Sequence, residues 1–171
     1  MDIFIKVAEK YDIYDSWLSK IGFSGMHKHF FTIGYEGRTI EELVRELRAN
    51  NIECVLDVRQ IAFSRKPGFS KSRLAQRLGD ASIEYIHMRE LGSPKSVREQ
   101  LKATGDYTRF FREVEDHISG QRDAIEAAYA YVQNKICCLM CFERLAAACH
   151  RKVVAREIKE RDRNGLEIRN I

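Results

Sequence analysis

Several apolar runs of this sequence end in side chains that could do chemistry. Cys149 and His150 open a segment of helical spacing, where backbone amides and the neighbouring Arg151 would bias a thiol toward thiolate. Cys149 is therefore a candidate nucleophile, and His150 and Glu143 are candidate proton-transfer groups. The alternatives are equally open, because Cys149 could be a buried packing residue and Glu143 could pair with Arg151.

A carboxylate and a guanidinium end another apolar run. Asp57 and Arg59 are two residues apart, which places both side chains on the same side of a strand. Together they could orient a substrate, with Asp57 as a further candidate catalytic group and Arg59 as an anion ligand. Alternatively, they could pair only with each other.

The segment 59–77 is one-sided in charge, because it carries six basic residues and no acidic one. Arg65 within it is a candidate phosphate ligand, and Phe69 is a candidate base-stacking side chain. Phe63 is a second aromatic residue of this segment, and such a mixture suits a phosphate or a nucleobase. A solvated basic loop is the alternative.

Other candidate ligand-binding residues follow the remaining runs. Gly34 precedes a helix start, where amides could approach an anion and Arg38 could add charge, although a tight turn is the alternative. Tyr85 could stack or donate a hydrogen bond, and His87 and Cys141 lie at strand ends.

Metal binding is the less favoured interpretation. Cys141, Cys149, His150 and His87 could be ligands, but Cys-x7-Cys-His departs from the usual paired spacing, and adjacent residues are expected to point different ways. We therefore assign no metal ligands from the sequence, which also indicates no particular cofactor.

The elements that position these groups follow from apolar periodicity. Strands are predicted at 30–34, 54–58, 84–88, 136–141 and 166–169, and helices at 39–47, 70–78, 107–118, 122–133 and 149–161. Thr39 is the predicted cap of the first helix, with Glu42 at the capping-box position, and Ser70 is the predicted cap of the second. Their alternation predicts an α/β fold, with a mostly parallel sheet of four or five strands flanked by helices. The candidate residues would then gather at the carboxyl ends of the strands, where such sheets bind ligands.

Length and composition predict a single α/β domain over 26–171 with a helical extension over 1–25. The chain has 171 residues, 44% of them hydrophobic, which supports one core. Residues 2–20 have the spacing of an amphipathic helix, which could dock on the domain, on a second copy or on another protein.

The protein is predicted to be cytoplasmic and not to associate with a membrane. The apolar runs are far shorter than the roughly 20 residues of a membrane-spanning helix, and the N-terminus lacks an uncharged signal core. The five cysteines are not distributed as in a secreted disulfide scaffold. The net charge of +4 permits a phosphate-bearing partner but is weaker than that of a dedicated nucleic-acid binder.

Seven segments taken together resemble the DUF488 family, with a C-x-E motif followed by C-H-R; they are residues 32–38, 57–59, 64–69, 85–87, 91–92, 141–143 and 149–151. The resemblance covers about residues 30–171, and the N-terminal helix lies outside the family pattern. It implies an α/β domain with a site formed by Asp57, Arg59, Arg65, His87, Cys141, Glu143, Cys149, His150 and Arg151. It implies no reaction, since none is established for the family.

The leading hypothesis is a protein that binds a phosphate-bearing ligand, a nucleotide or nucleic acid, at the carboxyl ends of the strands, with Arg59, Arg65 and Arg151 holding the anion. The sequence leaves open whether it is an enzyme; an enzyme would depend on a cysteine or a carboxylate and act on that ligand. One alternative is a non-catalytic nucleic-acid-binding module in which Phe69 or Tyr35 stacks on a base. The other is a protein-interaction module that docks through residues 1–22.

Overall fold

Short runs of mostly buried residues form the three central strands of the sheet, as expected of parallel strands that are covered on both faces, whereas the two edge strands are half-buried or exposed. A computed structural model describes residues 28–171. Its strands are β1 (His29–Gly34), β2 (Cys54–Asp57), β3 (Glu84–His87), β4 (Cys137–Cys141) and β5 (Glu167–Asn170). They form one sheet in the order β3-β2-β4-β1-β5, with every pair parallel. The predicted α/β fold and parallel sheet are therefore confirmed.

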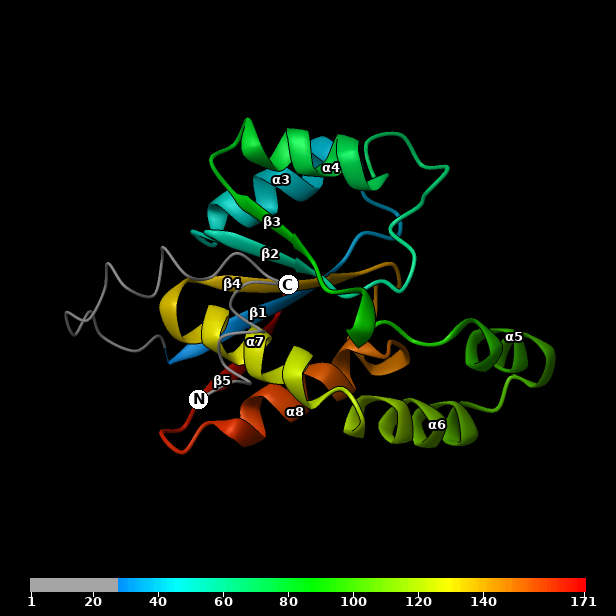
Figure 1. The fold of residues 1–171 in the computed structure, drawn as a ribbon. Coiled ribbons are helices and arrows are strands. Elements are labelled where there is room, and N and C mark those ends of the chain that lie inside the picture. Colours follow the sequence, from blue (N-terminus) through cyan, green and yellow to red (C-terminus); the bar gives the residue numbers. More distant parts are fainter. Residues whose placement is uncertain (1–27) are drawn as a thin grey trace.

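Helices cover both faces of this sheet (Figure 1). One face packs against α3 (Ile40–Ala49) and α4 (Lys71–Gly79) through a hydrophobic cluster that includes Leu43 and Leu74. The other face packs against α7 (Arg122–Asn134) and α8 (Arg151–Arg161). The helices α5 (Lys95–Thr104) and α6 (Tyr107–Ser119) extend beyond the carboxyl ends of the strands, where α6 packs against α8 (Figure 1).

The connections diverge between β1 and β4, which are neighbours in the sheet. The chain leaves β1 through α3 on one face, whereas it leaves β4 through a short 3-10 turn, Ala146–Ala148, and α8 on the opposite face. Adjacent strands whose chains depart to opposite faces mark the switch point of such a sheet, where ligands usually bind. A ligand-binding site is therefore expected at the loops after β1 and β4.

A capping box starts α3, as the sequence predicts. Thr39 Oγ1 accepts a hydrogen bond from Glu42 N at 3.2 Å, and Glu42 Oε2 accepts one from Thr39 N at 2.7 Å. Ser70 occupies the corresponding position before α4, but its side chain makes no capping hydrogen bond. Both helix starts have a hydroxyl residue at the N-cap, but the third helical residue is Glu42 in α3 and Arg73 in α4, and only in α3 does the N-cap side chain make a capping hydrogen bond.

This difference predicts unequal effects of alanine substitution. Thr39→Ala should lower the free energy of unfolding by about 1 kcal/mol, the usual value of an N-cap hydrogen bond. Ser70→Ala, the matched control, should change it by less than about half of that amount, because no capping bond is lost. Urea denaturation of both variants measures the difference, and equal losses would contradict the assigned role of Thr39.

The structure also differs from the sequence expectations. The sequence did not predict α5, because only Val97 on it is buried and the helix therefore lacks an apolar stripe. The predicted helix over 2–20 and the domain boundary at 25/26 lie outside the described residues.

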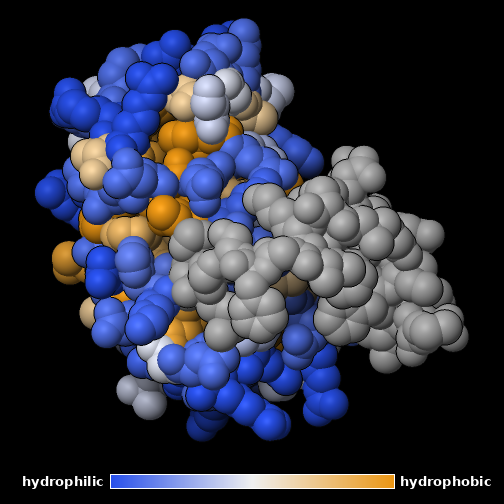
Figure 2. All heavy atoms as spheres, turned by 90° about the vertical axis from the view of Figure 1, so that its left-hand side faces the viewer, coloured by the Kyte–Doolittle hydropathy of each residue, from blue (hydrophilic) through white to orange (hydrophobic). Residues whose placement is uncertain are grey.

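At the end where the strands begin, the visible surface of the described residues is largely hydrophilic, with hydrophobic side chains exposed in places (Figure 2). In residues 28–171, no helix combines the length and the apolar character that crossing a membrane requires.

Candidate functional site

Asp57 and Arg59 form a buried ion pair at the end of β2. The Arg59 Nη2 lies 2.6 Å from Asp57 Oδ2, and Arg59 Nε lies 2.8 Å from Asp57 Oδ1. The Asp57 side chain is fully buried and that of Arg59 is nearly so. Of the two alternatives that the sequence left open, the structure thus shows these residues paired with each other.

The remaining hydrogen-bonding groups of this pair also have protein partners. Tyr85 donates its hydroxyl proton to Asp57 Oδ2 at 2.7 Å, and Arg59 Nη1 donates to Tyr35 Oη at 2.9 Å and to the Phe69 carbonyl at 3.0 Å. His87 Nε2 lies 2.8 Å from the Arg59 carbonyl oxygen. The network connects β1, β2, β3 and the loop before α4, so it holds the strand ends together.

Burial and charge set the ionisation of this network. Burial alone would lower the pKa of Arg59, but the hydrogen bonds and charge of Asp57 outweigh it, so the pKa is raised. Burial raises the pKa of Tyr85, and the adjacent Asp57 carboxylate raises it further. Arg59 is therefore held as a cation and Tyr85 as a neutral hydrogen-bond donor.

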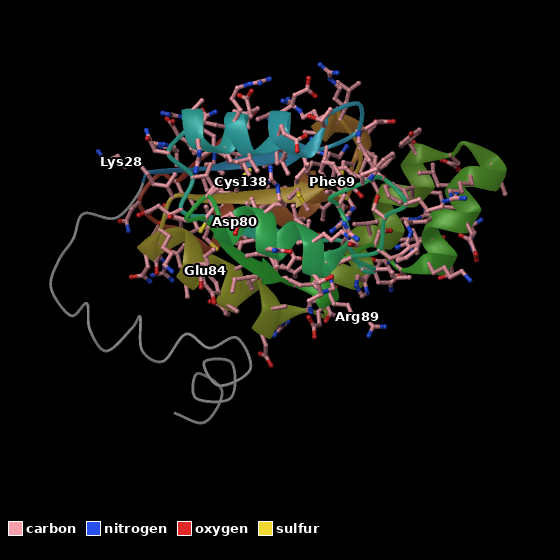
Figure 3. The ribbon with its side chains drawn as sticks, turned by 90° about the horizontal axis from the view of Figure 1, so that it is seen from above. Lys28, Phe69, Asp80, Glu84, Arg89 and Cys138 are labelled. Carbon is pink, nitrogen blue, oxygen red and sulfur yellow. The ribbon has the colours of Figure 1, made fainter. Side chains whose placement is uncertain are left out.

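Phe69 and Tyr35, named above for stacking on a base, instead stack on each other. Their ring centroids are 4.3 Å apart with an interplanar angle of 15°, and both side chains are buried. In Figure 3, Phe69 lies beneath the helices, farther toward the carboxyl ends of the strands than Cys138. The aromatic ring that does reach solvent in this loop is Phe63, which is 72% exposed.

Arg151 is directed into the protein. Its side chain is buried, and its guanidinium donates to Thr32 Oγ1 at 3.2 Å, to the Arg144 carbonyl at 3.0 Å and to the Glu143 carbonyl. These contacts hold the chain after β4 against β1. The guanidinium predicted to bind an anion thus binds backbone carbonyls.

Gly34 is required by a close approach of two backbone segments. A Cβ atom at this position would lie 1.9 Å from the Glu143 carbonyl oxygen, so no larger residue fits without backbone movement. Hydrogen bonds from Tyr35 N to the Cys141 carbonyl at 3.2 Å and from Glu36 N to the Phe142 carbonyl at 2.9 Å continue the β1–β4 contact beyond the strands. The missing side chain of Gly34 therefore makes room for the chain after β4.

The other two predicted anion ligands lie nearer the surface. Arg38 is partly buried and its Nη1 lies 3.6 Å from Glu46 Oε2. Arg65 is exposed in the loop between β2 and α4. Of the arginines predicted to bind an anion, Arg65 is the one whose side chain is mainly exposed to solvent.

Two cysteines, a glutamate and a histidine meet at the switch point. Glu143 Oε2 lies 3.2 Å from Cys141 Sγ and 3.0 Å from Cys149 Sγ, and His150 Nδ1 lies 3.6 Å and 3.9 Å from the same two sulfur atoms. Cys141, Cys149 and His150 are buried, and Glu143 is half-buried. The sequence predicted that the adjacent side chains of Cys149 and His150 point in different directions. This prediction was wrong, because both side chains lie close to Cys141. We call these four residues the thiol cluster.

The protonation states of the thiol cluster depend on its burial. Burial raises the pKa of Cys149, which is the opposite of the direction expected for a thiol at a helix start; α8 begins two residues later, at Arg151. Burial would raise the pKa of Glu143, but hydrogen bonds led by that of Cys149 lower it overall. Burial would lower the pKa of His150, but its contact with Cys149 raises it overall.

The sequence analysis missed several residues near these groups. Thr32 and Tyr35 hold the two buried arginines, and neither was named for that role. Phe142 and Leu145 are exposed apolar side chains on the loop after β4. An apolar residue in a loop at a strand end is the signal that could have identified these two.

The fold and the arrangement of these residues define an α/β protein with a parallel sheet and a polar cluster at its switch point. The family model described as "Domain of unknown function DUF488" matches residues 39–158. This chain belongs to the DUF488 family. Comparison with curated proteins and with solved structures found no match.

Proposed function

We propose that this DUF488 protein binds a phosphate-bearing ligand, a nucleotide or a single-stranded nucleic acid, at the carboxyl end of its sheet and acts on it there. The observation that carries the proposal is that Phe63 and Arg65, two residues apart on the loop after β2, are both exposed. Exposed Phe142 and Leu145 lie on the loop after β4, the strand next to β2. Aromatic rings that stack on bases and cations that contact phosphates are the usual means of binding such ligands.

The anion contacts are assigned to exposed side chains. Lys71 and Arg73 on α4 are exposed and follow Arg65 in a segment without acidic residues. Arg59 and Arg151 are left out of this role because their guanidinium groups already have internal partners. Their role in the proposal is to hold the loops that carry the exposed contacts.

The acting groups of the proposal are members of the thiol cluster. Glu143 is half-buried, whereas Cys149 and His150 behind it are buried, so a ligand would meet Glu143 first. We assign proton transfer to Glu143. We assign the role of nucleophile to Cys149 and a second proton-transfer role to His150. Asp57 is assigned to positioning Arg59, because its carboxylate is occupied by Arg59 and Tyr85.

The ligand-binding part is tested by fluorescence anisotropy with a labelled single-stranded oligodeoxynucleotide and with ATP as an unlabelled competitor. We expect affinity to fall with salt concentration, and Arg65→Ala to reduce the slope of that dependence by about one unit. Phe63→Ala should weaken binding by about 1–3 kcal/mol, the usual range for one stacked base.

Arg48→Ala is the matched control. Arg48 is exposed in the last turn of α3, at the other end of the sheet, so its loss should leave affinity nearly unchanged. Absence of binding at low salt together with absence of competition by ATP would refute the proposal. Equal effects of the Arg48 and Arg65 variants would show that only net charge matters.

A non-catalytic nucleic-acid-binding module is the second candidate, and the same exposed residues favour it. Incubation with radiolabelled oligonucleotide and nucleotides, followed by chromatography of the products, separates the two. Turnover that is lost in Glu143→Gln while affinity is kept supports the enzyme. Binding without turnover supports the module.

A further inference from the structure

We infer that the thiol cluster is a binding site for one zinc ion, with Cys141, Glu143, Cys149 and His150 as its ligands. The inference starts from their chemistry, since two sulfurs, an imidazole nitrogen and a carboxylate oxygen form a donor set that suits zinc. Magnesium and calcium are disfavoured because they take oxygen ligands. One ligand atom from each residue lies within 4.8 Å of all the others.

The distances between these atoms fit tetrahedral coordination. Bonds of about 2.0–2.3 Å at tetrahedral angles separate the ligand atoms of a zinc ion by roughly 3.3–3.8 Å. The two sulfur–carboxylate distances are 3.2 and 3.0 Å, and the two sulfur–nitrogen distances are 3.6 and 3.9 Å. These four distances lie within a few tenths of an ångström of that range, and the sulfur–sulfur and oxygen–nitrogen pairs lie within 4.8 Å.

A second observation concerns the orientation of His150. Its Nε2 lies 2.8 Å from the Val58 carbonyl oxygen, which can only accept a hydrogen bond, so Nε2 carries the proton. In the neutral imidazole, the form that binds a metal, the lone pair of Nδ1 then faces the two sulfur atoms. An imidazole that donates to a backbone carbonyl and presents its other nitrogen to the metal is the usual arrangement of a histidine ligand.

The surroundings also suit a bound cation. Cys141 and Cys149 belong to the hydrophobic cluster beneath α6, α7 and α8, and a carboxylate in such surroundings needs a compensating charge. The Arg151 backbone N–H points at Cys149 Sγ at 3.5 Å, a contact that would stabilise a thiolate ligand. Zinc would offset two of the three negative charges carried by the carboxylate and by the two thiolates formed on binding.

The full chain, purified under reducing conditions, is tested by titration with Zn²⁺ against a chromophoric chelator and by titration with Co²⁺. We expect one ion per chain, with a thiolate-to-cobalt charge-transfer band and the intense visible bands of tetrahedral cobalt. Cys141→Ser and Cys149→Ser should weaken zinc binding by at least about 100-fold, because loss of an outer-shell partner alone costs roughly 10–100-fold. Glu143→Gln, at a half-buried position, should also weaken it and is the variant least disturbing to the fold.

Cys138→Ala is the matched control, since Cys138 lies on the same strand but faces the cluster under α3 and α4. It should retain stoichiometric zinc. Absence of the charge-transfer band in the wild-type chain, or equal loss of zinc in the control, would overturn the inference. A Cys141–Cys149 disulfide in the reduced preparation would also overturn it, in favour of a redox pair.

No phosphate-bearing ligand is present in these titrations, so the zinc site and the proposed ligand binding can fail independently. The titrations also decide between two roles of Cys149, Glu143 and His150. Side chains that coordinate the ion are ligands, and they are then not free to act as the nucleophile and the proton-transfer groups of the proposed function.

Discussion

Replacing Asp57 by alanine should lower the free energy of unfolding by about 3–5 kcal/mol, because it leaves the Arg59 guanidinium buried without its counter-charge. Both charges are almost completely removed from solvent and are joined by short hydrogen bonds. The Tyr85 hydroxyl would lose its acceptor at the same time. Denaturation by urea, with the intrinsic fluorescence and the circular dichroism of the chain as two probes, measures the loss.

A double variant separates the cost of an unpaired charge from the value of the pair. Asp57→Leu with Arg59→Met removes both charges, and we expect it to regain most of the stability lost in Asp57→Ala. The exposed pair of Arg77 and Glu41 is the matched control, since its atoms lie 3.4 Å apart at the surface. Glu41→Ala should cost less than about 1 kcal/mol. A loss of that size in Asp57→Ala would contradict the structural role assigned to the buried pair.

Replacing Arg151 by methionine should lower the free energy of unfolding by about 3 kcal/mol. Methionine fills a similar volume but leaves the Glu143 and Arg144 carbonyls and the Thr32 hydroxyl without their donor, and each unsatisfied group costs about 1–3 kcal/mol without full additivity. The chain after β4 would also lose its attachment to β1. The same urea titrations, combined with limited proteolysis of this loop, measure both effects.

Lysine at this position tests whether geometry or charge is needed. We expect Arg151→Lys to recover little of the loss, because an ammonium group cannot direct several donors along the fixed fork of a guanidinium. Arg156→Met on the same helix is the control; Arg156 is half-exposed and its ion pairs are at the surface, so the cost should stay below about 1 kcal/mol. Full recovery with lysine would mean that Arg151 acts mainly as a charge, as in the anion-binding interpretation.

The sequence by itself determined the local elements and the neighbourhood of the site. Apolar runs and segments of helical spacing alternate along the chain, and this pattern predicted the strands and most of the helices. Such patterns depend only on residues a few positions apart in the sequence. Thr39 and Glu42 identified the start of α3 for the same reason. Since parallel strands end at a common edge, the sequence also predicted that Cys141 and Cys149 would lie near Asp57 and Arg59.

Only the tertiary structure decided what each side chain at that edge contacts. Arg59 pairs with Asp57, Arg151 turns inward to carbonyls of the chain after β4, and Phe69 is buried. These outcomes depend on the strand order β3-β2-β4-β1-β5 and on which groups can be desolvated together, and neither is encoded in local periodicity. The approach of Cys141 and Glu143 to Cys149 and His150 has the same origin. The strand and the helix that carry them meet only because α8 packs back on β4.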